Sequence, residues 1–183
     1  MAGDFLTITG AVGGTPLVRL TSMAPDGATI LAKLESMNPL GSIKDRVAVA
    51  MVERAERDGR MGPGSTIVEP TSGNTGVGLA FAGASRGYRV ILVMPRSAST
   101  ERRRLLAALG AELFLVDGGM SAAVDTTHEI LERIDDAVFL NQFGNPANPG
   151  VHEATTGPEI WRDAGGDLDA FVAGVGTGGA ITG

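Results

Sequence analysis

The chain has 183 residues, which is enough for one domain or for one domain and part of a second. With 15 basic and 21 acidic residues its formal charge is -6, so no basic surface that would follow a nucleic-acid backbone is indicated. The absence of cysteine excludes disulfides, thiolate metal sites and a cysteine nucleophile. We therefore expect no nucleic-acid partner.

Short runs rich in valine, isoleucine and leucine alternate with longer segments of helical period, which is typical of parallel strands joined by crossover helices. This pattern predicts an α/β fold with parallel sheets. Most of the predicted strands are apolar throughout, as strands covered on both faces are. In chain order, strands are predicted at residues 17–20, 29–34, 66–69, 89–94, 112–116, 137–140 and 168–173.

The segments between these strands predict the crossover helices. Ser42 is a plausible cap for the first helix, Gly59 a plausible stop, and Pro158 should lie in the first turn of the last helix or kink it. No helix can follow the final glycine cluster before the sequence ends, so we expect a piece of a longer protein. Helices are predicted at residues 42–58, 73–86, 99–109, 121–133 and 151–164.

The sequence also predicts where the protein resides. No stretch approaches the ~20 apolar residues of a membrane-spanning helix. The start, Met1–Phe5, lacks the basic flank and apolar run of a secretory signal. We therefore expect a cytoplasmic protein with no membrane partner. His128 and His152 lie far apart with no nearby ligand at metal-binding spacing, so no metal site is predicted and both are interpreted as structural or exposed.

Lysine is scarce, because the chain has thirteen arginines and only Lys33 and Lys44. Lys33 lies in a predicted strand, where an edge or snorkelling position is expected. Lys44 lies in the first turn of the helix predicted at 42–58, where the positive end of the helix dipole should lower its pKa. A partly neutral amine is what a Schiff base with a carbonyl cofactor requires. An ordinary exposed lysine is the alternative.

Two polar clusters follow predicted strands. Residues 70–76 offer hydroxyls, an amide and free backbone N–H groups at the start of a helix, which suits a carboxylate or phosphate. A capped turn is the alternative. Residues 141–146 place amides at a strand's carboxyl end, where open α/β sheets bind ligands, although an Asn-Pro turn explains part of this run. The arginines of residues 101–104 are interpreted as a solvated helix face.

A third cluster, Gly174-x-Gly176-x-x-Gly179, follows the last predicted strand. We interpret it as a phosphate-binding loop. The same spacing occurs in nicotinamide-binding proteins, but the acidic residue expected about 20 positions later has no chain to occupy.

Five motifs occur in order and together resemble the cysteine synthase (O-acetylserine sulfhydrylase) family. They are residues 38–46, 71–76, 141–149, 155–161 and 176–179. The resemblance implies the type II fold of enzymes that use pyridoxal phosphate (PLP). It further implies a complete small mobile domain at residues 41–145, with residues 1–40 and 146–183 forming part of a larger domain.

The resemblance also implies site roles. Lys44 would hold PLP as a Schiff base and act as the catalytic base, and Asn74 would bind the cofactor's ring hydroxyl. Ala180 replaces the threonine usual at its position, and the serine that meets the ring nitrogen has no counterpart here. The substrate carboxylate would be held by Thr71, Ser72, Thr75 and Gln142, and the phosphate by Gly176, Thr177, Gly178 and Gly179.

The reaction implied is β-replacement, in which O-acetyl-L-serine and sulfide become L-cysteine and acetate. A homodimer and the C-terminal tail of serine acetyltransferase are the implied partners. A cystathionine β-synthase or a serine or threonine dehydratase is the alternative within related enzymes. An inactive, truncated binding module is the alternative from another class.

Overall fold

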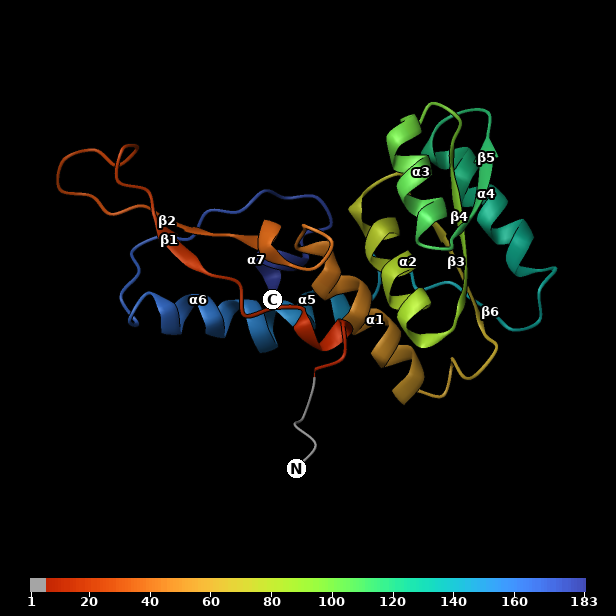
Figure 1. The fold of residues 1–183 in the computed structure, drawn as a ribbon, viewed down its shortest axis with the longest axis horizontal. Helices are drawn as coiled ribbons and strands as arrows, with labels where there is room; N and C mark the ends of the chain where they lie inside the picture. The colour runs from red at the N-terminus through yellow and green to blue at the C-terminus, as the bar shows by residue number, and fades with distance from the viewer. Residues whose placement is uncertain (1–5) are drawn as a thin grey trace.

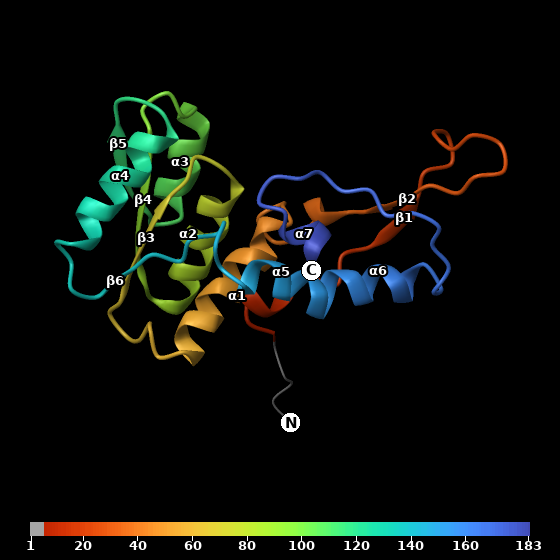
Figure 2. The same ribbon diagram turned by 180° about the vertical axis from the view of Figure 1, so that it is seen from behind.

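The computed structural model describes residues 6–183, so the targeting argument made on Met1–Phe5 lies outside the described residues. The predicted mixed α/β fold with a parallel sheet is confirmed (Figures 1 and 2). No helix within residues 6–183 is long and apolar enough to cross a bilayer. The strands are β1 Leu17–Arg19, β2 Leu31–Lys33, β3 Thr66–Pro70, β4 Arg89–Pro95, β5 Glu112–Val116 and β6 Ala137–Val138. The helices are η1 Thr9–Ala11, η2 Glu35–Met37, α1 Lys44–Arg57, α2 Asn74–Arg86, α3 Thr100–Ala108, α4 Met120–Leu131, α5 Ala147–Val151, η3 His152–Thr156, α6 Gly157–Asp163 and α7 Gly179–Thr182.

The main sheet has four parallel strands in the order β5-β4-β3-β6. All five residues of β3 are buried, because helices cover both faces of the sheet. Side chains alternate between the faces: Ile67 and Leu92 pack in the core that includes α1 and α2, whereas Val68 and Ile91 pack with α4. The two central strands, β3 and β4, therefore owe their continuous apolar runs to burial on both sides, whereas β5 and β6 at the edges are only partly buried.

The first two strands differ from the prediction. β1 and β2 pair antiparallel, with Leu17 opposite Lys33. Residues 20–30 between them are shorter than the crossover of about a dozen residues that a parallel pair requires. The chain therefore turns back as a hairpin, which Figure 1 shows away from the main sheet.

The strand predicted at residues 168–173 is absent. The segment is irregular, and Phe171 and Val172 are 51% and 91% exposed. An apolar run becomes a strand only where a neighbouring strand completes its hydrogen bonds, and no strand among residues 6–183 pairs with it. The prediction that no helix follows the glycine cluster is also wrong, because α7 forms a single turn there.

The helix predicted at residues 151–164 is divided into α5, a π-helical turn and α6. Pro158 lies in the first turn of α6. Since proline lacks an N–H and its ring clashes with the carbonyl four residues earlier, a regular α-helix cannot pass through this position. The wider π-helical turn of residues 152–156 accommodates the proline ring and the missing N–H.

Helix α1 lies between two groups of elements (Figures 1 and 2). On one side are the parallel sheet and α2, α3 and α4, and on the other are the hairpin and α5, α6 and α7. Because α1 packs against both α2 and α5, the residues at its start lie close to both groups. The division at residues 41 and 145 stays a prediction.

Gly78 permits the close packing of α2 on α1. A Cβ at this position would lie 2.8 Å from the Cβ of Ala48 and 3.0 Å from the carbonyl oxygen of Lys44. We expect Gly78→Ala to lower the free energy of unfolding by about 1–3 kcal/mol, because α2 must move away from α1. Urea unfolding measures this change. Gly73→Ala is the control, since its Cβ meets nothing within 4 Å, and equal midpoints for the two variants would contradict the packing argument.

Candidate active site

The loop before α1 places Lys44 at the first position of the helix. Gly41 has a φ of 80°, which side chains rarely adopt, and it makes the turn into the helix. The carboxylate of Asp45 accepts the backbone N–H of Leu40 at 2.7 Å. Ser42, predicted as the cap, lies one residue before the N-cap residue Ile43, and its hydroxyl accepts the N–H of Lys44 at 3.2 Å. These bonds fasten the loop on both sides of Lys44.

The Lys44 amine is partly buried, and its Nζ lies 3.5 Å from the Thr177 hydroxyl. Within residues 6–183 it forms no ion pair with a carboxylate. Burial lowers the pKa of Lys44 by desolvating its charged form, which is the direction expected for a lysine at the start of a helix. A neutral amine is the form that attacks a carbonyl group.

The loop between β3 and α2 brings Thr75 to Gln142. The Thr75 hydroxyl donates a hydrogen bond of 2.5 Å to Oε1 of Gln142, and both side chains are buried. Thr71 is buried, and its hydroxyl accepts the N–H of Gly73 at 3.2 Å. Ser72 directs its hydroxyl towards the sulfur of Met120 at 3.9 Å. The loop thus keeps hydroxyl groups beside the Gln142 turn.

Asn74 contacts Arg102, one of the arginines predicted to lie on a solvated helix face. Its Oδ1 accepts a hydrogen bond of 3.1 Å from Nη1 of Arg102, on α3. The bond is exposed, so residues 101–104 form the solvated helix face that was predicted, and Arg102 in addition contacts the loop before α2. Nothing in the arginine run distinguishes this one, because the contact depends on where α3 lies beside the loop.

The glycine cluster lies beside Lys44. None of the backbone N–H groups of residues 176–180 donates a hydrogen bond to another residue of the described chain. Gly178 has a φ of 84° and leads into α7. The Thr177 hydroxyl accepts the Nδ2 of Asn148 at 2.9 Å, and the same Nδ2 lies 2.9 Å from the carbonyl oxygen of Gln142. Asn148, which is buried, therefore links the Gln142 turn to the glycine cluster.

A buried ionic cluster lies at the first turn of α1. Arg46 donates to the carboxylates of Glu35 and Glu159 at 2.7–2.9 Å. Lys33 lies on an edge strand as expected, because β1 and β2 form a two-stranded sheet, but it does not snorkel: it pairs with Glu159 at 2.8 Å and its side chain is 8% exposed. The hydrogen bond from Arg46 is the main cause that lowers the pKa of Glu159 to about 2. The cluster joins the hairpin, α1 and α6.

His152 is buried, and its Nδ1 lies 2.9 Å from the Thr156 hydroxyl. Burial and then the nearby positive charge of Lys44 lower its pKa to about 4. The imidazole is therefore neutral at physiological pH. No group of three or more potential metal ligands occurs in residues 6–183.

The geometry gathers a partly buried amine with a lowered pKa, a set of free N–H donors and a group of hydroxyls and amides around the start of α1. The family model for pyridoxal-phosphate dependent enzymes matches residues 8–183. The chain belongs to this family. Its members use PLP, which is a carbonyl cofactor of the kind that the Lys44 amine was expected to bind.

Curated relatives of this chain include cysteine synthases. The chain is 52% identical to cysteine synthase from Staphylococcus aureus (strain Mu50 / ATCC 700699), covering 96% of this chain and 58% of that protein. It is 51% identical to cysteine synthase A from Escherichia coli (strain K12), covering 94% and 54%. The chain thus spans little more than half the length of these relatives.

The structural comparison agrees. The solved structure of cysteine synthase (OASS) from Entamoeba histolytica matches with a TM-score of 0.93 and 43% identity, over 99% of this chain and 56% of that one. The type II fold expected for this PLP enzyme family is therefore confirmed.

Proposed function

We propose that the protein carries out PLP-dependent β-replacement, forming L-cysteine and acetate from O-acetyl-L-serine and sulfide. The observation that carries the proposal is the partly buried Lys44 amine, unpaired with any described carboxylate and 3.5 Å from the Thr177 hydroxyl of the glycine cluster. Such an amine can form a Schiff base and later exchange a proton.

The residues present fit PLP. Free N–H groups in residues 176–180 are suited to a phosphate. A Cβ on Gly176 or Gly178 would meet nothing within 4 Å, so the cluster leaves open space, whereas one on Gly179 would strike Asn148. We propose that Lys44, Asn74, Gly176, Thr177, Gly178 and Gly179 hold the cofactor. Ala180 contributes a backbone N–H but no hydroxyl.

When bound, PLP supplies an electron sink for negative charge at the substrate Cα. We propose that the carboxylate of the amino acid is held by Thr71, Ser72, Thr75 and Gln142. Fixing the carboxylate orients the Cα–H bond towards the Lys44 amine, which removes the proton. Because burial disfavours the charged form of Lys44, the amine is available as a base.

We further propose that residues 41–145 act as a small mobile domain that excludes water when substrate binds. Residues 1–40 and 146–183 would belong to a larger domain. A cytoplasmic homodimer and binding of a serine acetyltransferase C-terminal tail are proposals from the family resemblance. Light scattering tests the homodimer, and a titration with the acetyltransferase peptide tests the binding of the tail.

The relatives described above are all cysteine synthases, which favours this reaction over cystathionine synthesis, dehydration of serine or threonine, and a purely binding role. Assays that offer sulfide and homocysteine separately distinguish cysteine synthesis from cystathionine synthesis. Turnover with homocysteine alone would contradict the proposed reaction.

The test of the cofactor site is chemical trapping. The chain is incubated with PLP, reduced with borohydride, digested and mapped by mass spectrometry. Only Lys33, Lys44 and the terminal amine can carry the label, because the sequence has no other lysine. We expect the pyridoxyl group on Lys44. A label on Lys33, or none, would contradict the proposal.

A further inference from the structure

Glu69 is a buried carboxylate that the proposed chemistry does not use. It lies near the end of β3, two residues before Thr71, and is 1% exposed. Within the described chain it forms no ion pair. A buried carboxylate is costly unless hydrogen bonds compensate for the lost water. The question is therefore which groups compensate Glu69.

The partners of Glu69 are backbone N–H groups of the turn after β6. Its Oε2 accepts the N–H of Asn141 at 3.0 Å, and its Oε1 accepts the N–H of Gln142 at 3.2 Å. Asn141 has a φ of 53°, and it is the only described residue other than glycine with a positive φ. Asparagine adopts this conformation more readily than other residues with side chains, and the two bonds to Glu69 hold the turn in it.

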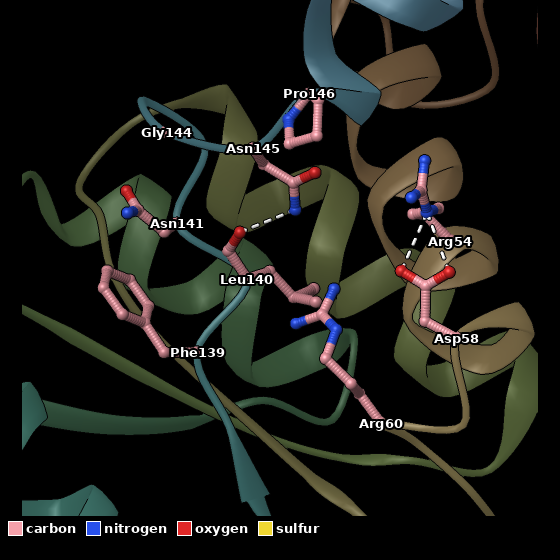
Figure 3. Close-up of a pocket in the computed structure, with 9 residues that line it drawn as sticks. All are labelled: Arg54, Asp58, Arg60, Phe139, Leu140, Asn141, Gly144, Asn145 and Pro146. Atoms are coloured by element: carbon pink, nitrogen blue, oxygen red, sulfur yellow. Dashed lines mark hydrogen bonds and ion pairs between the residues drawn. The ribbon is translucent and has the colours of Figure 1, made fainter.

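The turn supported in this way presents Gln142 to the candidate site. The Gln142 side chain accepts the Thr75 hydroxyl, and its carbonyl oxygen accepts Asn148. A further bond of 2.7 Å joins the Asn145 amide to the carbonyl oxygen of Leu140 inside the turn (Figure 3). Glu69 thus connects the strand that leads into the Thr71 loop with the turn that carries Gln142.

We propose that Glu69 is a positioning residue, whose two carboxylate oxygens hold the Asn141 and Gln142 N–H groups and thereby fix the Gln142 side chain for the carboxylate of the amino-acid substrate. The inference rests on the proposed function for the role of Gln142. A carboxylate suits the task because it accepts both N–H groups, whereas an amide has one acceptor oxygen.

Protonation of Glu69 would weaken this support, because one oxygen would then carry a proton and accept poorly. Burial raises the pKa of Glu69 to about 7, although the N–H groups of residues 140–142 oppose the rise. No charged side chain contributes to this pKa, although Arg54 and Arg60, the latter without an ion pair in residues 6–183, line the cavity that adjoins the turn. Leu92 is its register partner on β4, β6 and residues 139–145 are uncharged, α2 has no charged residue before Arg86, and α4 packs on the other face.

A cavity of ≈ 270 Å³ adjoins the turn between residues 139–146 and the end of α1 (Figure 3). The α1 side chain that lines it, Arg54, is paired with Asp58 at 2.8 Å, and Arg60 lines it as well. Leu140 and Asn141, whose N–H groups contact the Glu69 carboxylate, are among the residues that line this cavity. The positioning should therefore weaken as the pH falls through about 7.

The direct test needs no cofactor. Amide proton shifts of Asn141 and Gln142 are followed by NMR from pH 5.5 to 8.5, a range of about 1.5 units on either side of the Glu69 midpoint. We expect both to titrate together in the wild type and to be flat in Glu69→Gln. Glu112→Gln, which changes an exposed carboxylate on β5, should keep the titration. Asn141 and Gln142 amide shifts that are the same in the wild type and in Glu69→Gln across this pH range would overturn the proposal.

The second test measures substrate binding in the PLP-loaded chain. L-serine, which has the carboxylate but no acetyl leaving group, is titrated spectroscopically. Loss of one charge-assisted bond should weaken its binding about tenfold in Glu69→Gln and leave the trapped label unchanged. In a Gln142→Leu background, Glu69→Gln should have no further effect, and an equal loss there would overturn the proposal. A wild type that takes no PLP would contradict the proposed function, while the NMR test still decides the role of Glu69.

Discussion

Lys44→Arg is expected to abolish the visible absorption band that the chain gains on incubation with PLP. The substitution keeps the positive charge, but a guanidinium does not lose its proton near neutral pH and cannot form the Schiff base. Lys44 lies 3.5 Å from the Thr177 hydroxyl, whereas Lys33, the only other lysine, is held by Glu159 and Asp163. No second lysine can therefore replace Lys44, and the loss should be complete rather than partial. Absorbance spectra of the dialysed proteins measure the result.

Lys33→Arg is the matched control for this experiment. Lys33 is held by Glu159 and Asp163 in the ionic cluster, and arginine can pair with the same carboxylates. The control should therefore keep the band. If the band disappears with Lys33→Arg and persists with Lys44→Arg, the assignment of the cofactor lysine is wrong.

Arg46→Met is expected to produce the largest loss of stability, about 3–5 kcal/mol in the free energy of unfolding. The arginine side chain is 2% exposed and satisfies two carboxylates. Methionine fills a similar volume but leaves Glu35 and Glu159 without their shared partner. Urea unfolding measures the change. Arg54→Met is the control, because its pair with Asp58 on the same helix is exposed and should contribute less than about 1 kcal/mol.

The same variant has a predictable dependence on pH. The pKa of Glu159 falls from an ordinary 4.5 to about 2 in the folded protein, chiefly because Arg46 donates to it. Its contribution to stability is therefore present above pH 4.5 and is lost as the pH falls towards about 2. The stability difference between the wild type and Arg46→Met should shrink over this range. A constant difference would contradict the role given to the ion pair.

The sequence alone determined the fold class and the positions of the main chemical groups. Strands buried on both faces have continuous apolar runs, so β3 and β4 were predictable from local composition. The edge strand β5 was predictable from its run of β-forming residues, although only Val116 is buried. Lys44 was recognisable because it is one of two lysines and starts a helix, and the loops at 71–76 and 176–179 because of their residue types. These signals are local, and they do not depend on where other segments lie.

Only the tertiary structure decided which groups meet. Asn148 joins Gln142 to Thr177, and Glu69 supports a turn more than seventy residues away in sequence. Lys33 is buried in an ion pair because α6 brings Glu159 to the hairpin, and residues 168–173 form no strand because no described strand lies beside them. Burial, pKa and strand pairing are properties of neighbours in space, and local sequence does not specify those neighbours.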